Sequence, residues 1–208
     1  EPGFIMIKSI SSADSWWCYH AELPNEVLYI SSTSGALSAP GWITVDDSSF
    51  SFNGNGNSFN RNGSDYVAYL FAKDTPYVKC GKYTATGGGS TVNVGFKPRW
   101  VLIKKTSSSS NWFIIDKTMQ GNGQHLWANR DEQVQTGFTY TFTNTGFSIT
   151  EQSSTGVTDG GAEYVYIAIA DESEGHPPSA PSSSTVLENP DVNGAVLKVN
   201  AESFDVGA

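Results

Sequence analysis

The chain has 208 residues with a formal net charge of −9, and only 16% of its residues are charged. Its 12 Lys and Arg residues are scattered, which argues against a nucleic-acid partner, and no apolar run reaches the roughly 18 residues that a membrane-spanning helix needs. Aromatic residues reach 12%, and Gly, Ser, Thr and Asn are abundant, which favours a β-rich fold over long helices.

The first predicted strand, at residues 4–8, belongs to a segment that recurs later in the chain. The matching segments are 1–8 with 97–104, 16–17 with 112–113, and 65–72 with 163–170. The offset is 96 for the first two pairs (97 − 1 and 112 − 16) and 98 for the third (163 − 65). A period near one hundred residues is too long for a solenoid repeat and is typical of a small domain copied in series.

Short apolar runs separated by turn sequences follow one another through both copies. Segments such as 53–57 and 121–123 are rich in Asn and Gly and tolerate the positive φ angles of tight turns. The closing run at 164–170 is apolar on both faces, which predicts a central position in a sheet. The predicted strands are 4–8, 16–19, 27–30, 50–52 and 65–72 in the first copy, and 100–104, 112–115, 124–128, 147–149 and 164–170 in the second.

This pattern predicts an all-β fold of tandem antiparallel β-sandwich domains, with a jelly-roll or related topology. A closed barrel is the alternative, and the sequence does not determine the strand order. Helices are expected to be scarce.

The repeat also predicts the domain boundaries. The first β-sandwich repeat covers residues 1–74 and the second covers 75–170. A strand-turn-strand pattern at 78–96 precedes only the second copy, so we expect the first to be truncated at its N-terminus and the sequence to come from a longer protein. Residues 171–185 form a Pro- and Ser-rich linker, and 186–208 begin a further β domain or form a C-terminal extension that packs back on the second repeat.

No catalytic, cofactor or metal site is predicted. His20, His125 and His176 are far apart in sequence, and the repeat preserves neither a metal-ligand pattern nor a Ser-His-Asp arrangement. The adjacent acids at 46–47 and 131–132 suit solvated loops, with calcium binding as a minor alternative. Cys18 is expected to be a small buried apolar residue, because the second copy has Ile114 at its position, and a Cys18–Cys80 disulfide is not expected.

The six tryptophans divide into two groups. Four lie in strand-like runs and are expected to fill the core, and for Trp16 and Trp112 this predicts burial at equivalent positions. Trp42 and Trp127 lie nearer loops, where an exposed indole can stack on a sugar ring or on a partner's side chain. They are the candidate residues for glycan or partner contact, and core packing remains the alternative for both. The predicted core tryptophans are Trp16, Trp17, Trp100 and Trp112.

The segment Gly-Phe-Lys-Pro-Arg-Trp-Val-Leu-Ile-Lys at 95–104 resembles a module of tail fibres and other appendage proteins of bacteriophages, notably marine ones. A Gly-rich leader at 87–90, a Ser-rich turn at 107–110 and a closing strand at 161–168 also match, and the resemblance extends to the later part of the module in 1–74. Family members often carry Asp directly after the proline. This chain has Gly3 and Arg99 there, so any role of that acid is absent or altered.

The resemblance implies a concanavalin-like sandwich used as a building block of the virion surface. We therefore expect a structural, non-enzymatic protein at the virion surface or outside the cell. The expected partners are identical copies, with a trimer favoured, other virion proteins, and host surface glycan. The alternatives are a carbohydrate-binding adhesin module of a secreted bacterial protein and a polysaccharide depolymerase.

Overall fold

The computed structural model describes residues 1–53, 59–151, 156–171 and 197–198. The described elements are antiparallel strands and one short 3-10 helix, η1 (Lys117–Asn122), so the prediction of an all-β fold is confirmed. The predicted turn at 53–57 and the linker at 171–185 fall almost wholly outside the described residues. No helix in the described ranges is long and apolar enough to cross a membrane.

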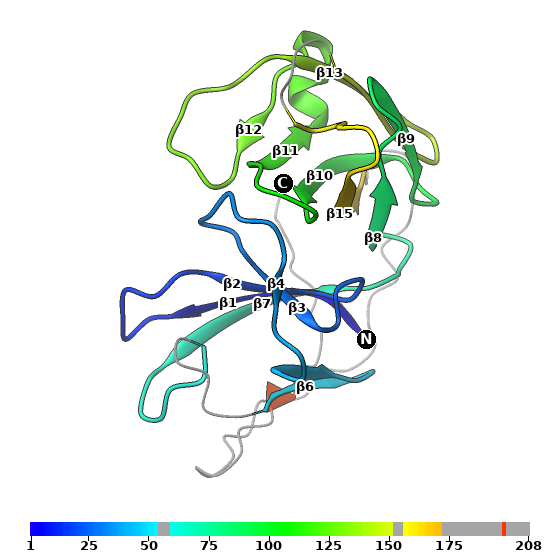
Figure 1. Ribbon diagram of the computed structural model, residues 1–208. Helices are drawn as coiled ribbons and strands as arrows, with labels where there is room; N and C mark the ends of the chain where they lie inside the picture. The colour runs from blue at the N-terminus through cyan, green and yellow to red at the C-terminus, as the bar shows by residue number, and fades with distance from the viewer. Residues whose placement is uncertain (54–58, 152–155, 172–196, 199–208) are drawn as a thin grey trace, which may run out of the picture.

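Each repeat contributes one five-stranded sheet. The first major sheet has the order β4-β3-β2-β1-β7, and the second major sheet has the order β12-β11-β10-β15-β8. In Figure 1 the first repeat (blue to cyan) fills the lower half of the molecule, and the second (green to yellow) fills the upper half. The strands are β1 (Pro2–Ser9), β2 (Trp17–His20), β3 (Glu26–Tyr29), β4 (Leu37–Ser38) and β7 (Tyr66–Ala72), then β8 (Val78–Thr84), β10 (Pro98–Lys105), β11 (Trp112–Asp116), β12 (Leu126–Trp127) and β15 (Glu163–Ala170).

A three-stranded sheet accompanies each major sheet. The first minor sheet has the order β16-β6-β5, and the second has the order β13-β14-β9. Strand β16 of the first minor sheet comes from the segment 186–208. Its residue Leu197 pairs with Phe50 of the first repeat rather than with a residue of the second repeat. The strands are β5 (Ile43–Val45), β6 (Ser49–Phe52), β16 (Leu197–Lys198), β9 (Gly89–Asn93), β13 (Phe138–Thr143) and β14 (Gly146–Glu151).

The two repeats have the same pairing in their major sheets. Ile5 pairs with Tyr19 on one side and Leu70 on the other, while Val101 pairs with Ile115 and Ala168. The offsets of 96 and 98 from the sequence therefore connect structurally equivalent residues. Both repeats also have a register shift directly after the proline that begins β1 or β10.

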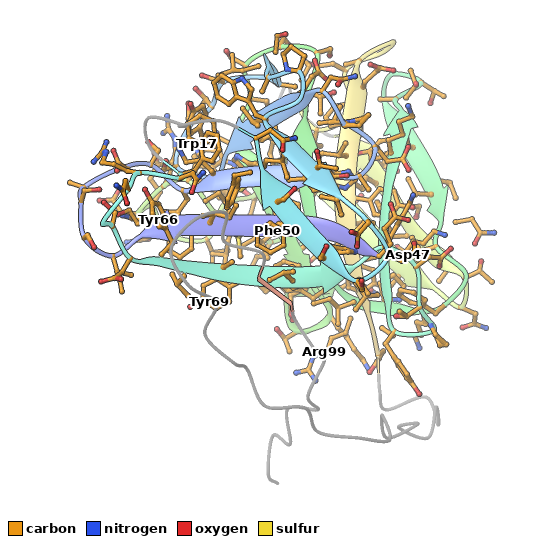
Figure 2. The ribbon with its side chains drawn as sticks, turned by 90° about the horizontal axis from the view of Figure 1, so that it is seen from below. Trp17, Asp47, Phe50, Tyr66, Tyr69 and Arg99 are labelled. Atoms are coloured by element: carbon orange, nitrogen blue, oxygen red, sulfur yellow. The ribbon has the colours of Figure 1, made fainter. Side chains whose placement is uncertain are left out.

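Close neighbours at the bulge of the first repeat require glycine at position 3. A Cβ atom on Gly3 would lie 2.4 Å from the Cα atom of Lys73 and 2.8 Å from the Sγ atom of Cys80. Any side chain there would force the backbone of β1 away from its neighbours. The equivalent Arg99 is exposed (Figure 2), so the two copies differ at this site because of their surroundings.

The closing strands of the two repeats occupy different positions. As predicted, β15 is central, because it pairs with β10 on one side and β8 on the other. The equivalent strand β7 pairs only with β1 among the described residues and forms the edge of its sheet. The closing position in the repeat therefore does not ensure a central strand.

Buried side chains form three clusters that explain the continuous apolar runs of β1 and β10. In β1, Ile5 and Ile7 face an outer cluster shared with the first minor sheet, while Phe4 faces the opposite side. In β10, Val101 and Ile103 face the outer cluster of the second repeat, while Leu102 faces the opposite side. Both strands are covered on both faces, as the sequence predicted.

The third cluster joins the two major sheets, and we call it the central cluster. It contains Phe4, Cys18 and Leu28 from the first repeat and Cys80, Leu102, Trp112, Val165 and Ile167 from the second. The two repeats that the sequence places in series are therefore packed together, because the two major sheets bury side chains against each other. Cys18 and Cys80 are both free and buried, which confirms the predicted burial of Cys18 and the absence of a bridge between the two.

Hydrogen bonds reinforce this contact between the repeats. The indole nitrogen of Trp112 donates to the carbonyl oxygen of Tyr29 at 2.9 Å. The Lys104 ammonium is fully buried and donates to the carbonyl oxygens of Thr33 (3.1 Å) and Ser110 (2.8 Å). Burial lowers the pKa of Lys104 to about 8, and the nearby charge of Lys105 acts in the same direction.

Candidate functional site

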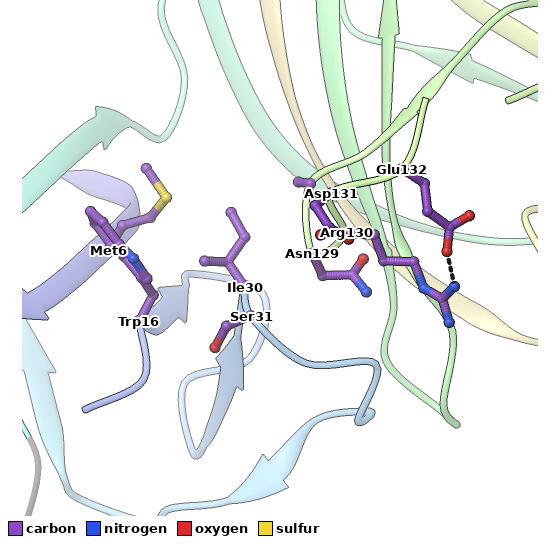
Figure 3. Close-up of a pocket in the computed structure, with 9 residues that line it drawn as sticks. Met6, Trp16, Ile30, Ser31, Asn129, Arg130, Asp131 and Glu132 are labelled. Carbon is purple, nitrogen blue, oxygen red and sulfur yellow. Dashed lines mark hydrogen bonds and ion pairs between the residues drawn. The ribbon is translucent and has the colours of Figure 1, made fainter. Parts of the chain in front are cut away.

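A groove of about 750 Å³ lies at the margin between the two repeats (Figure 3). One side is formed by the first repeat, with Trp16 just before β2 and Met6 on β1. The other side is formed by the loop that follows β12. The lining residues are Met6, Trp16, Ile30, Ser31, Ala128, Asn129, Arg130, Asp131 and Glu132.

Trp16 is the aromatic residue of this groove. It is half-buried, and its ring centroid lies 6.0 Å from that of Tyr69, which is 50% exposed. The equivalent Trp112 is 1% exposed, in the central cluster. The prediction of burial is therefore confirmed for Trp112 and wrong for Trp16, because only the second repeat inserts this side chain between the sheets.

Arg130 lies on the opposite side of the groove and contacts two neighbouring side chains. Its guanidinium lies over the ring of Trp127, 5.1 Å from the centroid, and forms an ion pair with Glu132. The side chain of Asn129 is also held, since its oxygen accepts from the amide of Trp112 (2.8 Å) and its nitrogen donates to Asn111 (2.9 Å). Asp131 is exposed to solvent.

A second, more polar hollow of about 480 Å³ continues past Arg130. Within it, the Asp159 carboxylate accepts a hydrogen bond from Lys105 at 2.5 Å. The two hollows share Arg130, so polar groups extend from the groove along the edge of the contact between the repeats. The hollow is lined by Thr33, Ser109, Ser110, Asn111, Arg130, Gly156 and Asp159.

The predicted contact residue Trp127 lies on β12 and is half-buried against the outer cluster of the second repeat. Its ring is covered by Arg130, and its indole nitrogen is buried without a hydrogen-bond partner among the described residues. This position suits packing better than direct contact with a ligand. The register makes Trp127 equivalent to Tyr29, which also packs against an outer cluster.

The other predicted contact residue, Trp42, is 39% exposed. Its ring stacks on Phe59 at 5.6 Å and lies 5.6 Å from Trp17, at the outer cluster of the first repeat. The two candidate tryptophans pack against different outer clusters, which the two major sheets separate, so they do not form one site. Because the repeat predicts Trp16 in the core, the sequence gives no signal for the groove that this residue lines.

The histidines occupy separate buried positions. His20 lies between the repeats, where its Nε2 atom is 3.1 Å from the carbonyl oxygen of Tyr166 and its Nδ1 atom accepts from the amide of Glu22. His125 stacks on Phe138 with centroids 4.2 Å apart. His176 lies outside the described residues. Over the ranges that the structure describes, no group of three or more His, Cys, Asp or Glu side chains could hold a metal ion.

The acidic pairs have ordinary structural surroundings. Asp46 is exposed and accepts hydrogen bonds from the amides of Ser48 (2.8 Å) and Ser49 (2.6 Å), which lower its pKa. These bonds close a turn between β5 and β6. In the other pair, Glu132 is bound to Arg130.

Comparison with known proteins gives one match. A search of curated proteins and a search of solved structures each found none. The family described as "Domain of unknown function (DUF7483)" matches residues 1–173. This match spans both repeats, and the chain belongs to this DUF7483 family.

Proposed function

We propose that this chain is a structural protein of a bacteriophage virion surface, part of a tail fibre or similar appendage. The observation that carries the proposal is the close packing of two equivalent repeats through the central cluster. A block with several stacked sheets and hydrogen bonds between its halves suits a part that must keep a fixed shape. The resemblance of the segment 95–104 to phage appendage modules supports the same function.

In this proposal each repeat is a β-sandwich of concanavalin-like topology. Support comes from the outer clusters, each of which combines side chains of a major sheet and a minor sheet. In the second repeat, Phe113 and Tyr164 of the major sheet share their cluster with Phe138 and Phe147 of the minor sheet. Antiparallel pairing throughout is consistent with this architecture.

The proposed partners are identical copies, with a trimer favoured, other virion proteins, and host surface glycan. The low charge and the many Gly and Ser residues allow strands and loops to approach identical neighbours. Several copies would also raise the avidity of a weak glycan site. The proposed location is the virion surface, outside the cell, and the proposed role is not enzymatic.

Gold-labelled antibody against residues 1–173 tests the assignment on purified particles of a phage whose genome encodes this protein. We expect label on the tail or its appendages in electron micrographs. Label confined to the surface of the bacterial cell would instead favour the adhesin alternative. A parallel assay for new reducing ends, with host polysaccharide as substrate, tests the depolymerase alternative, and we expect no release above the rate without protein.

A further inference from the structure

The groove exists because the two repeats do not contact each other symmetrically. Met6 and Trp16 are equivalent to Leu102 and Trp112, since both offsets are 96 (102 − 6 and 112 − 16). Leu102 and Trp112 are 3% and 1% exposed. Trp112 reaches the first repeat, where its ring centroid is 6.3 Å from that of Phe4. Trp16 makes no such insertion and instead lines the groove.

One wall of the groove offers an apolar surface. Trp16, Met6 and Ile30 line it, and the half-exposed ring of Tyr69 lies beside the indole. An indole in such a position presents a flat surface with a negative π face. The apolar C–H face of a sugar ring is complementary to this surface in shape and in charge distribution.

The opposite wall offers hydrogen-bonding groups, both at the margin of the fold and in solvent. The Asn129 amide is held by two hydrogen bonds, and the Arg130 guanidinium is held between Trp127 and Glu132. Amide, guanidinium and carboxylate groups together can donate to and accept from sugar hydroxyl groups. The polar hollow beyond Arg130 offers further such groups, including Ser109 and Asn111.

The charges of the groove select among possible sugars. Asp131 and Glu132 contribute two negative charges and Arg130 one positive charge, so the wall has a net charge of −1, and the whole chain has −9. The net negative charges of the wall and of the whole chain would both repel an anionic sugar. The volume of about 750 Å³ lies within the range of roughly 300–1,000 Å³ that ligand pockets occupy.

We propose that the groove between the repeats binds a neutral oligosaccharide, with Trp16 stacking on a sugar ring and Asn129, Arg130 and Asp131 binding its hydroxyl groups. The proposal rests on the glycan contact included in the proposed function. It places that contact in the groove instead of at Trp42 and Trp127. A ligand in the groove touches both repeats at once, so the packed pair of repeats is the binding unit.

Fluorine NMR of the full chain labelled with 5-fluorotryptophan tests this proposal. The probes are neutral tetrasaccharides of glucose, galactose, mannose and N-acetylglucosamine, each added to roughly 10 mM, which would nearly saturate a site with a Kd of about 1 mM. The Trp16 signal is assigned from a Trp16→Phe variant. We expect it to shift with at least one tetrasaccharide, while the signal of Trp42 stays in place.

Variants then separate binding from folding. Trp16→Ala should weaken binding of the shifting tetrasaccharide about tenfold or more, whereas the matched variant Trp42→Ala should change Kd by less than about twofold. Asp131→Asn replaces an exposed carboxylate by an amide of the same size and should weaken binding several-fold with no change in the unfolding midpoint.

The proposal is overturned if the Trp16 signal does not move with any of the four tetrasaccharides, or if Trp16→Ala binds them as the unchanged protein does. Either result leaves the virion assignment intact, because particle labelling does not depend on sugar binding. Conversely, label absent from particles together with a shifting Trp16 signal would overturn the virion function and support the groove.

Discussion

His125 is a buried imidazole whose ring nitrogens make no hydrogen bond of normal geometry with the described residues. Burial lowers its pKa to about 4, although a backbone contact with Gly123 acts in the opposite direction. An unsatisfied buried polar group costs about 1–3 kcal/mol. In the first repeat the equivalent residue is Val27 (125 − 98), which is buried in an outer cluster.

His125→Val should therefore raise the free energy of unfolding by about 1 kcal/mol or more at pH 7. The substitution removes the polar group and introduces the residue that the first repeat already uses at this position. Urea titration followed by tryptophan fluorescence measures the change. A loss of stability would show that the stacking of the imidazole on Phe138 contributes more than its unpaired nitrogens cost.

His20 should make the contact between the repeats sensitive to acid. Burial is the main cause that lowers its pKa to about 4, against an ordinary value of 6.5, and its two hydrogen bonds require the neutral ring with a proton on Nε2. Between pH 6.5 and pH 4 the folded protein binds fewer protons here than the unfolded chain does. The free energy of unfolding therefore falls as the pH falls through this range.

We expect the contribution of His20 to this fall to be up to roughly 3 kcal/mol. His20→Gln is the matched variant, because its amide can still donate to the Tyr166 carbonyl and does not titrate. Stability measured by urea titration at pH 7 and at pH 4 should decline less in the variant by that amount. Equal declines in both proteins would exclude His20 as the cause.

The equivalent residues Trp16 and Trp112 should contribute differently to the free energy of unfolding. Trp112→Ala removes a side chain that is 1% exposed and hydrogen-bonded to Tyr29, and it should cost about 3–5 kcal/mol. Trp16→Ala removes a half-buried side chain at an open groove and should cost clearly less, about 1 kcal/mol. Denaturant titration of both variants checks this, and similar losses would mean that the groove is closed in solution.

Among the described strands, β7 is unusual in its composition and in its position. Its seven residues include neither a charge nor a proline, and among the described residues it pairs on one side only. Figure 2 shows Tyr66 and Tyr69 along β7 at the margin of the first repeat. Proteins generally protect such edges with charges, prolines or bulges, because an open edge can pair with another chain.

Tyr69→Lys should therefore lower the tendency of the chain to form oligomers. Tyr69 is 50% exposed, so the lysine can reach solvent while it places a charge on the edge. Native mass spectrometry at micromolar concentration should show an oligomer for the unchanged chain, a trimer before others, and a shift toward monomer for the variant. A strictly monomeric unchanged chain would argue against the fibre proposal.

At the scale of the whole molecule, the central cluster should make the two repeats unfold together. Leu102, Val165 and Ile167 of the second repeat are at most 3% exposed because the first repeat covers them, and burial of each is worth about 1.5–3 kcal/mol. Unfolding of either repeat alone would expose these side chains to water. The cost of that exposure couples the two halves.

Differential scanning calorimetry should accordingly give one transition whose calorimetric and van't Hoff enthalpies agree. Leu102→Ala should cost about 2–5 kcal/mol and lower the midpoint of this single transition. Two separate transitions in the unchanged protein would show that the repeats behave as independent domains despite their contact.

The amino-acid sequence alone predicts the repeat, the all-β class, the burial of β1 and β10 on both faces, and the burial of Trp17, Trp112 and Cys18. These features depend on local alternation of apolar residues and on turn chemistry, which the chain expresses within each copy. The offsets of 96 and 98 even gave the equivalent residues of the two major sheets, because insertions between equivalent strands change the numbering by only two.

How the two repeats pack against each other depends on contacts between residues far apart in the chain. Trp16 and Trp112 are the same residue type in the same repeat position, yet one lines a groove and the other fills the central cluster. Likewise β7 and β15 have similar apolar sequences, but among the described strands only β15 has a second neighbour, β8. The contact between the repeats is asymmetric, so the burial of a side chain there depends on which surface of the other repeat faces it. The residue pattern within one copy carries no information about that surface.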